Sequence, residues 1–189
     1  MSDQNFPQGE EEILKKIEIL EKRQDDSMQE ILYIMLEDAC KVTGSKLSYF
    51  AIISQDEQVL TMIGWSKSAM TGCKMIVKPM VYILEDTGLW GDAVRERKTV
   101  ITNDYKSLIK PTKKGYPPGH VDVEKHMNVP LFEGGRIVAL CGVGNSDLDY
   151  TDGHAKALTV YLNKAWKILK PKIVEWFVSK RSELNNYIF

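Results

Sequence analysis

The chain has 189 residues, of which 43% are hydrophobic, so it is long enough to bury a core without disulfide or metal support. Its 25 Lys and Arg residues against 26 Asp and Glu residues leave a formal charge of -1. This balance excludes the basic surface that binds nucleic acids or anionic membranes. Three widely spaced cysteines, a polar start and no long apolar run predict a cytoplasmic protein without disulfides, signal peptide or transmembrane helix.

The first part of the chain is predicted to be helical. Residues 1–9 contain few apolar anchors and are predicted to form a disordered tail. Residues 10–27 carry one apolar stripe among many charges, which is typical of a surface helix or of a helix that pairs with another. A wider apolar face follows from about Met28 to Val42, as expected for a helix packed on a sheet.

Apolar segments in the middle of the chain predict short strands and one short helix. In chain order they are strands over 47–54 and 59–65, an irregular strand or crossing loop over 74–84, a helix over 88–97 and a strand over 99–102. The first two strands flank a polar turn and are predicted to form a hairpin. The third segment is expected to be irregular because Pro79 cannot donate to a sheet ladder.

Residues 103–121 form a long predicted loop that is rich in proline and glycine. Loops of this length are uncommon inside compact domains and often carry function. Two strands follow, over 128–132 and 136–143, and the Gly-Gly turn between them supplies the positive φ angles of a tight hairpin. The second strand is apolar on both faces and is predicted to be a central strand.

A long helix is predicted to begin at Thr151 or Asp152, and it must kink or restart at Pro171, whose nitrogen cannot donate a hydrogen bond. The order of elements predicts an α+β fold, with an antiparallel sheet, the terminal helices on one face and irregular connections on the other. The expected units are the tail over 1–9, a helix over 10–27, a domain over 28–170 and a helical extension over 171–189.

Several strings of the chain resemble the GAF family of small-molecule sensor domains, in the subgroup found in bacterial and archaeal sensor kinases and cyclase-type signalling proteins. The strings cover residues 88–94, 99–105, 114–120, 128–132 and 137–145. The resemblance runs from about Met28 to Leu169. It implies a sheet of five or six strands with the terminal helices on one face, and a pocket formed by loops and a short helix on the other. It also implies a sensor rather than an enzyme.

The resemblance implies that the ligand is bound by residues in the segments that connect the strands. The candidate ligand-binding residues are Trp90, Asp104, Tyr105, Tyr116, His120 and Cys73. Some GAF domains that this chain resembles are haem-based redox or gas sensors, and His120 is the candidate axial ligand, ahead of His126, because it lies in a matching string. The thiolate of Cys73 could bind iron or form a covalent link. Haem is therefore one candidate, although the chain has no CxxCH attachment motif, and the identity of the ligand stays open.

Three functions stay open at this point. The first is a sensing domain that signals through its terminal helices to a second copy or to an output protein such as a kinase. The second is an interaction or dimerisation module without a ligand. The third is a thiol-based reductase of methionine sulfoxide, for which two reactive cysteines among Cys40, Cys73 and Cys141 would have to lie within bridging distance. Apolar positions on the terminal helices, including Trp176 and Phe177, predict a homodimer.

Overall fold

The computed structural model describes residues 9–72, 80–115 and 120–179. Within these ranges one antiparallel sheet runs in the order β3-β2-β1-β6-β5-β4. Its strands are β1 (Leu47–Ile53), β2 (Val59–Trp65), β3 (Met80–Ile83), β4 (Val100–Thr102), β5 (His126–Glu133) and β6 (Arg136–Gly144). The helices are α1 (Glu10–Lys22), α2 (Met28–Thr43), α3 (Lys67–Gly72), α4 (Asp92–Arg95) and α5 (Asp152–Ser179).

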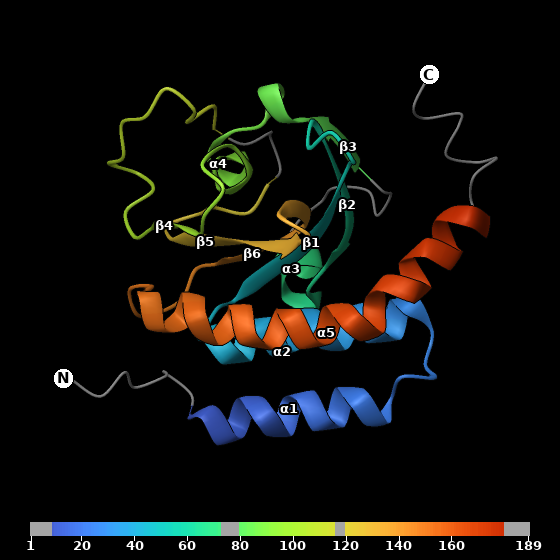
Figure 1. The fold of residues 1–189 in the computed structure, drawn as a ribbon. Coiled ribbons are helices and arrows are strands. Elements are labelled where there is room, and N and C mark those ends of the chain that lie inside the picture. Colours follow the sequence, from blue (N-terminus) through green and yellow to red (C-terminus); the bar gives the residue numbers. More distant parts are fainter. Residues whose placement is uncertain (1–8, 73–79, 116–119, 180–189) are drawn as a thin grey trace.

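The elements are arranged in layers, as Figure 1 shows. Helices α2 and α5 lie side by side under one face of the sheet, and α1 packs beneath this pair. Helix α4 and the long loop after β4 lie on the opposite face. The predicted α+β fold, with an antiparallel sheet and the terminal helices on one face, is confirmed.

Helix α2 fixes the helical layer against the sheet. Its N-cap is Ser27, which forms a capping box with Glu30, and its C-cap is Gly44, whose φ of +64° suits glycine. A Cβ atom at Gly64 of β2 would lie 2.6 Å from the side chain of Leu32. The missing side chain at position 64 therefore lets the helix approach the sheet closely, as the wide apolar face of α2 had predicted.

Helix α1 packs against α2 and α5 of the same chain. Its apolar stripe, Ile13, Ile17 and Leu20, is buried. Beside the stripe, Lys16 forms an ion pair of 3.1 Å with Asp38 of α2, and Tyr161 of α5 donates a hydrogen bond of 3.0 Å to the same carboxylate. The stripe from which we predicted a homodimer is thus covered within the chain, and Trp176 and Phe177 also pack, partly buried, against the core. The homodimer itself stays a prediction.

Two predicted elements differ in detail from the structure. The helix expected over 88–97 consists of a 3-10 turn, Leu89–Gly91, followed by the single turn of α4. The strand expected over 128–132 begins two residues earlier, at His126. Helix α5 continues through Pro171, and Figure 1 shows its last turns bending away from the direction of the first ones. Most of the predicted tail and the end of the C-terminal extension lie outside the described residues.

Candidate ligand-binding cavity

A cavity of about 230 Å³ lies on the α4 side of the sheet. Its walls come from the strands and from the connections above them, and most of the side chains are apolar or aromatic, as are Met62, Trp65, Met80, Tyr82, Leu89 and Trp90. None of the described lining residues is Asp, Glu, Lys or Arg. Since a cavity of about 150 Å³ already holds benzene, this one has room for a molecule with one or two rings.

The floor of the cavity contains a row of three residues on neighbouring strands. Gly142 of β6 is paired with Tyr49 of β1 on one side and with Asn128 of β5 on the other. Because position 142 has no side chain, Tyr49 reaches across β6 and donates a hydrogen bond of 2.6 Å to Asn128 Oδ1. A Cβ atom at position 142 would overlap the Tyr49 ring and lie 2.6 Å from the same oxygen.

His126 continues this row along β5. It lies two residues before Asn128, and so on the same face of the strand. Asn128 Nδ2 donates to His126 Nδ1 at 2.8 Å, because Asn128 Oδ1 is already turned toward Tyr49. With Nδ1 accepting, the proton of the neutral ring is on Nε2. This nitrogen is shielded from solvent and has no hydrogen-bond partner in the part of the chain that the structure describes.

Burial sets the charge of the His126 ring. Only 9% of the residue is exposed. Burial lowers the pKa of His126 to about 4, while the Asp92 carboxylate raises this pKa and the Lys110 ammonium lowers it to lesser extents. The imidazole is therefore neutral at pH 7, and the cavity presents an N–H donor without a formal charge.

Aromatic rings close the cavity on the side of the connections. The Trp90 ring stands edge-on to Tyr49, at a centroid distance of 6.2 Å, and to Tyr82, at 5.2 Å. Tyr105, from the long loop, stands edge-on to His126 at 5.9 Å. Such edge-to-face pairs hold rings in fixed orientations. A flat apolar molecule would therefore meet preformed walls.

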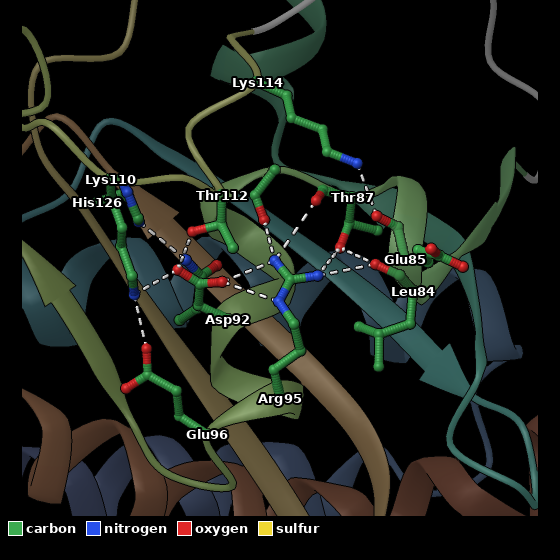
Figure 2. A network of polar contacts seen from close by, with 12 residues as sticks. Leu84, Glu85, Thr87, Asp92, Arg95, Glu96, Lys110, Thr112, Lys114 and His126 are labelled. Carbon is green, nitrogen blue, oxygen red and sulfur yellow. Dashed lines mark hydrogen bonds and ion pairs between the residues drawn. The ribbon is translucent and has the colours of Figure 1, made fainter.

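The long loop over the cavity is tied to α4 through Asp92, as Figure 2 shows. Asp92 is 1% exposed, and its carboxylate accepts hydrogen bonds from Arg95, Lys110 and Thr112. The last two residues belong to the loop, and Lys110 also bonds Glu96 at 2.6 Å. Burial alone would raise the pKa of Asp92, but these hydrogen bonds outweigh burial and lower it. The loop is thus anchored to a carboxylate that stays ionised.

The same cluster orders the backbone before α4. Arg95 donates to the carbonyl oxygens of Leu84, at 2.8 Å, and Gly88, at 2.6 Å. These bonds hold the chain before α4 in place, and the Gly88 carbonyl also accepts from the Gly91 N–H, the bond of the 3-10 turn that replaces the start of the predicted helix over 88–97. Lys114 adds a second tie from the loop, a hydrogen bond of 2.7 Å to the Glu85 carbonyl.

The structure brings three of the predicted ligand-binding residues to the cavity, namely Trp90, Tyr105 and His120. Asp104 does not line it, since that residue is exposed and its carboxylate accepts hydrogen bonds from Ser107. Tyr116 and Cys73 lie outside the described residues. The Nδ1 atom of His120 is 2.7 Å from the Val121 carbonyl oxygen.

Sequence reasoning missed the polar row in the floor and placed His126 second to His120. A signal was present, because His126 and Asn128 are polar residues at alternate positions of an otherwise apolar strand. Their partner Tyr49 lies 79 residues away from Asn128, and only the strand order brings the two together.

The two described cysteines lie outside the lining of the cavity. Cys40 and Cys141 are buried, and neither lines the cavity. Burial raises the pKa of the Cys40 thiol and raises that of Cys141 further. Thiols in this state are poor nucleophiles. Among the described residues, no three His, Cys, Asp or Glu side chains gather into a metal site, and no helix is long and apolar enough to cross a membrane.

Comparison with known protein families identifies the family to which this chain belongs. The model of the GAF domain matches residues 25–170. This chain belongs to the GAF domain family. The GAF domain described here is also 44% identical over 149 residues to the methyl sulfide methyltransferase-associated sensor of Methanosarcina acetivorans. That match covers 79% of this chain but 15% of the relative, so the chain spans a small part of the length of that protein.

Solved structures share the architecture of this GAF domain. The GAF domain of a phosphoenolpyruvate-protein phosphotransferase from Coxiella burnetii superposes with a TM-score of 0.65 and 13% identity, covering 96% of this chain and 98% of that one. A free methionine-R-sulfoxide reductase from Neisseria meningitidis, solved with its substrate, gives a TM-score of 0.54 and 16% identity, with 91% and 95% covered. At such identities the likeness shows the fold alone.

Proposed function

We propose that this GAF domain is a sensing module whose cavity on the α4 side of the sheet binds a small organic molecule. The observation that carries the proposal is the cavity itself, which combines ring-sized volume, aromatic walls and an anchored loop. Apolar cavities with a few polar groups are the usual form of small-molecule sites. The name of the Methanosarcina relative, a sensor, supports the same role.

A route from the cavity to the helices runs through β1. Ser48 lines the cavity, and its hydroxyl donates a hydrogen bond of 2.9 Å to the Leu36 carbonyl of α2. Phe50, two residues further along β1 and so on the same face as the Ser48 hydroxyl, packs against Trp166 of α5. A ligand that favours one position of β1 would therefore bias α2 and α5, to the extent of its differential affinity for the two positions. We propose that these helices pass the signal to a second copy or to an output module such as a kinase.

Haem is the second candidate ligand, and the His120 ring favours it. By donating its Nδ1–H to the Val121 carbonyl, His120 would carry its lone pair on Nε2, which is the arrangement that metal-ligating histidines use. Bound haem would supply redox or gas-binding chemistry. The cavity of about 230 Å³ is smaller than a porphyrin, so haem requires a wider cavity than the described residues form.

The remaining alternatives gain less support. A methionine sulfoxide reductase of the thiol type would use accessible cysteines, whereas Cys40 and Cys141 are buried away from the cavity. A pure interaction module gives no account of a cavity with fixed aromatic walls. We therefore keep ligand sensing as the proposed function.

Thermal unfolding in the presence of phenol, indole and acetophenone tests the proposal. Any compound that binds the folded cavity raises the midpoint of the wild type, in proportion to the logarithm of ligand concentration over Kd. The matched control is Ala69→Leu, which adds bulk to a lining residue and should abolish the shift. If all three compounds leave the wild type unchanged, or shift both proteins equally, binding in the cavity is contradicted.

Haemin titration followed by absorption spectroscopy tests the second candidate. A saturable Soret band that is lost in His120→Ala and kept in His126→Ala would assign haem to this site with His120 as axial ligand. A spectrum identical to that of free haemin would remove haem and leave the organic ligand.

A further inference from the structure

We propose that His126 is a ligand-binding residue, which donates a hydrogen bond from Nε2 to an acceptor atom of an uncharged, mainly apolar ligand. The role of His126 rests on the proposed function, namely that the cavity holds a small molecule. It adds the chemical class of that molecule and the residue that recognises it.

The direction of the hydrogen bonds in the cavity floor supports this role. Tyr49 is partly buried, and the loss of hydration raises the pKa of its hydroxyl, which stays protonated and donates to Asn128 Oδ1 at 2.6 Å. The amide of Asn128 is thereby oriented, with its Nδ2 donating to His126 Nδ1 at 2.8 Å. Tyr49 and Asn128 are committed to bonds within this row, whereas Nε2–H of His126 has no acceptor among the described residues and can donate to a ligand.

The burial of this donor supports the same conclusion. Nearly all buried polar groups in proteins have a hydrogen-bond partner, since an unpaired one loses its hydration without compensation. His126 Nε2 has none among the described residues, although its ring lines the cavity. A ligand acceptor in the cavity would satisfy it. In the part of the chain that the structure describes, a second buried side-chain nitrogen without a partner, Trp166 Nε1, belongs to a residue packed on the helical face.

The charges around the cavity select against ionic ligands. No described lining residue carries a charged side chain, and the nearby Asp92 and Lys110 are paired with each other at 2.6 Å. A carboxylate or an ammonium group in the cavity would therefore find no counter-ion among the described lining residues, and an unpaired buried charge is costly. A carbonyl, sulfoxide or ring nitrogen on an otherwise apolar molecule accepts from Nε2 without that cost.

A pair of probes that differ only in the acceptor tests this role. Acetophenone and α-methylstyrene have nearly the same shape, but only acetophenone has an oxygen that can accept a hydrogen bond. We expect the wild type to bind acetophenone about tenfold more tightly, as one well-placed hydrogen bond allows. In His126→Phe, which keeps a ring of similar size, both probes should bind with equal affinity. Titrations followed by NMR spectroscopy give the dissociation constants.

The outcomes separate the two proposals. If the wild type binds both probes equally, the role of His126 is overturned while the cavity remains a ligand site. If the wild type binds neither probe, the proposed function fails, and the role of His126 fails with it.

A measurement on the unmutated protein covers the case in which His126→Phe does not fold. The ¹⁵N shifts of the His126 ring at pH 7 should show a protonated Nε2 and an unprotonated Nδ1, and acetophenone should move the Nε2 signal more than the Nδ1 signal. A ring protonated on Nδ1 would overturn the role of His126 as a donor.

Discussion

At Gly142 the absence of a side chain lets Tyr49 cross β6 and meet Asn128. We expect Gly142→Ala to lower the free energy of unfolding by about 1–3 kcal/mol, because the added methyl group overlaps the Tyr49 ring. Gly144→Ala, on the same strand, is the matched control, since its Cβ would have no neighbour closer than 3.4 Å. Urea unfolding of both variants checks this, and equal destabilisation would contradict the packing described for position 142.

The His126 ring should make stability depend on pH. Its pKa is about 4 in the folded chain against about 6.5 in the unfolded chain, so the unfolded state binds more protons between these values. Stability from this residue is therefore fully present above about pH 6.5 and is lost as pH falls toward 4. The loss should reach about 3 kcal/mol at most, measured as the wild-type curve minus that of His126→Phe. If the unfolding free energies of the two proteins depend on pH in the same way, the His126 ring is not held neutral by burial.

At the scale of residues, the sequence predicted part of the cavity. Trp90, Tyr105 and His120 were found because they lie in strings that resemble a family. Asp104 lies in the same string as Tyr105, but a short Asp side chain directly before a turn accepts from the local backbone, here from the Ser107 N–H, more readily than it reaches a cavity. Asn128 and Tyr49 act as a pair only in the observed strand register, which a single sequence does not give.

At the scale of elements, the long loop depends on a carboxylate of α4. Asp92→Asn should lower the free energy of unfolding by about 2 kcal/mol, because Lys110 and Arg95 lose the charge that they share. It should also speed amide hydrogen exchange in residues 104–114, since the loop loses its anchor. Mass spectrometry of the exchanged protein measures this effect.

The matched control for the loop is Lys98→Ala. Lys98 pairs with Glu96 at 3.0 Å, but two thirds of its side chain is exposed, so its removal should cost no more than about 0.5 kcal/mol. If Asp92→Asn leaves the exchange of the loop as slow as this control does, the anchor is not what holds the loop.

Most elements could be predicted because their patterns are local. The Gly-Gly hairpin, the apolar face of α2 and the stripe of α5 each follow from neighbouring residues. The helix over 88–97 was extended too far, because its apolar spacing does not distinguish the 3-10 turn at Leu89–Gly91 from the first turn of an α-helix. Pro171 was expected to kink or restart its helix; α5 continues through Pro171, and its last turns bend away from the direction of the first ones.

At the scale of the whole molecule, the predicted homodimer has to use what α1 and α5 leave exposed. Leu14 and Ile19 are more than half exposed on α1, outside the buried stripe. If these positions form the interface, Leu14→Lys combined with Ile19→Lys should convert a dimer into a monomer. Leu148→Lys, in the loop before α5, is the control at an apolar residue that is even more exposed. Sedimentation at micromolar concentration checks both, and a monomeric wild type would contradict the dimer.

The layered arrangement offers a direct test of whether the cavity is the ligand site. Met62, Met70 and Met80 line the cavity, whereas Met35 and Met127 are buried in the core on the helical side. In protein labelled with ¹³C at the methionine methyl groups, added acetophenone should shift the signals of the first three saturably, and by more than those of the other two. Shifts that are absent, or larger for Met35 and Met127, would contradict a ligand-binding cavity in this GAF domain.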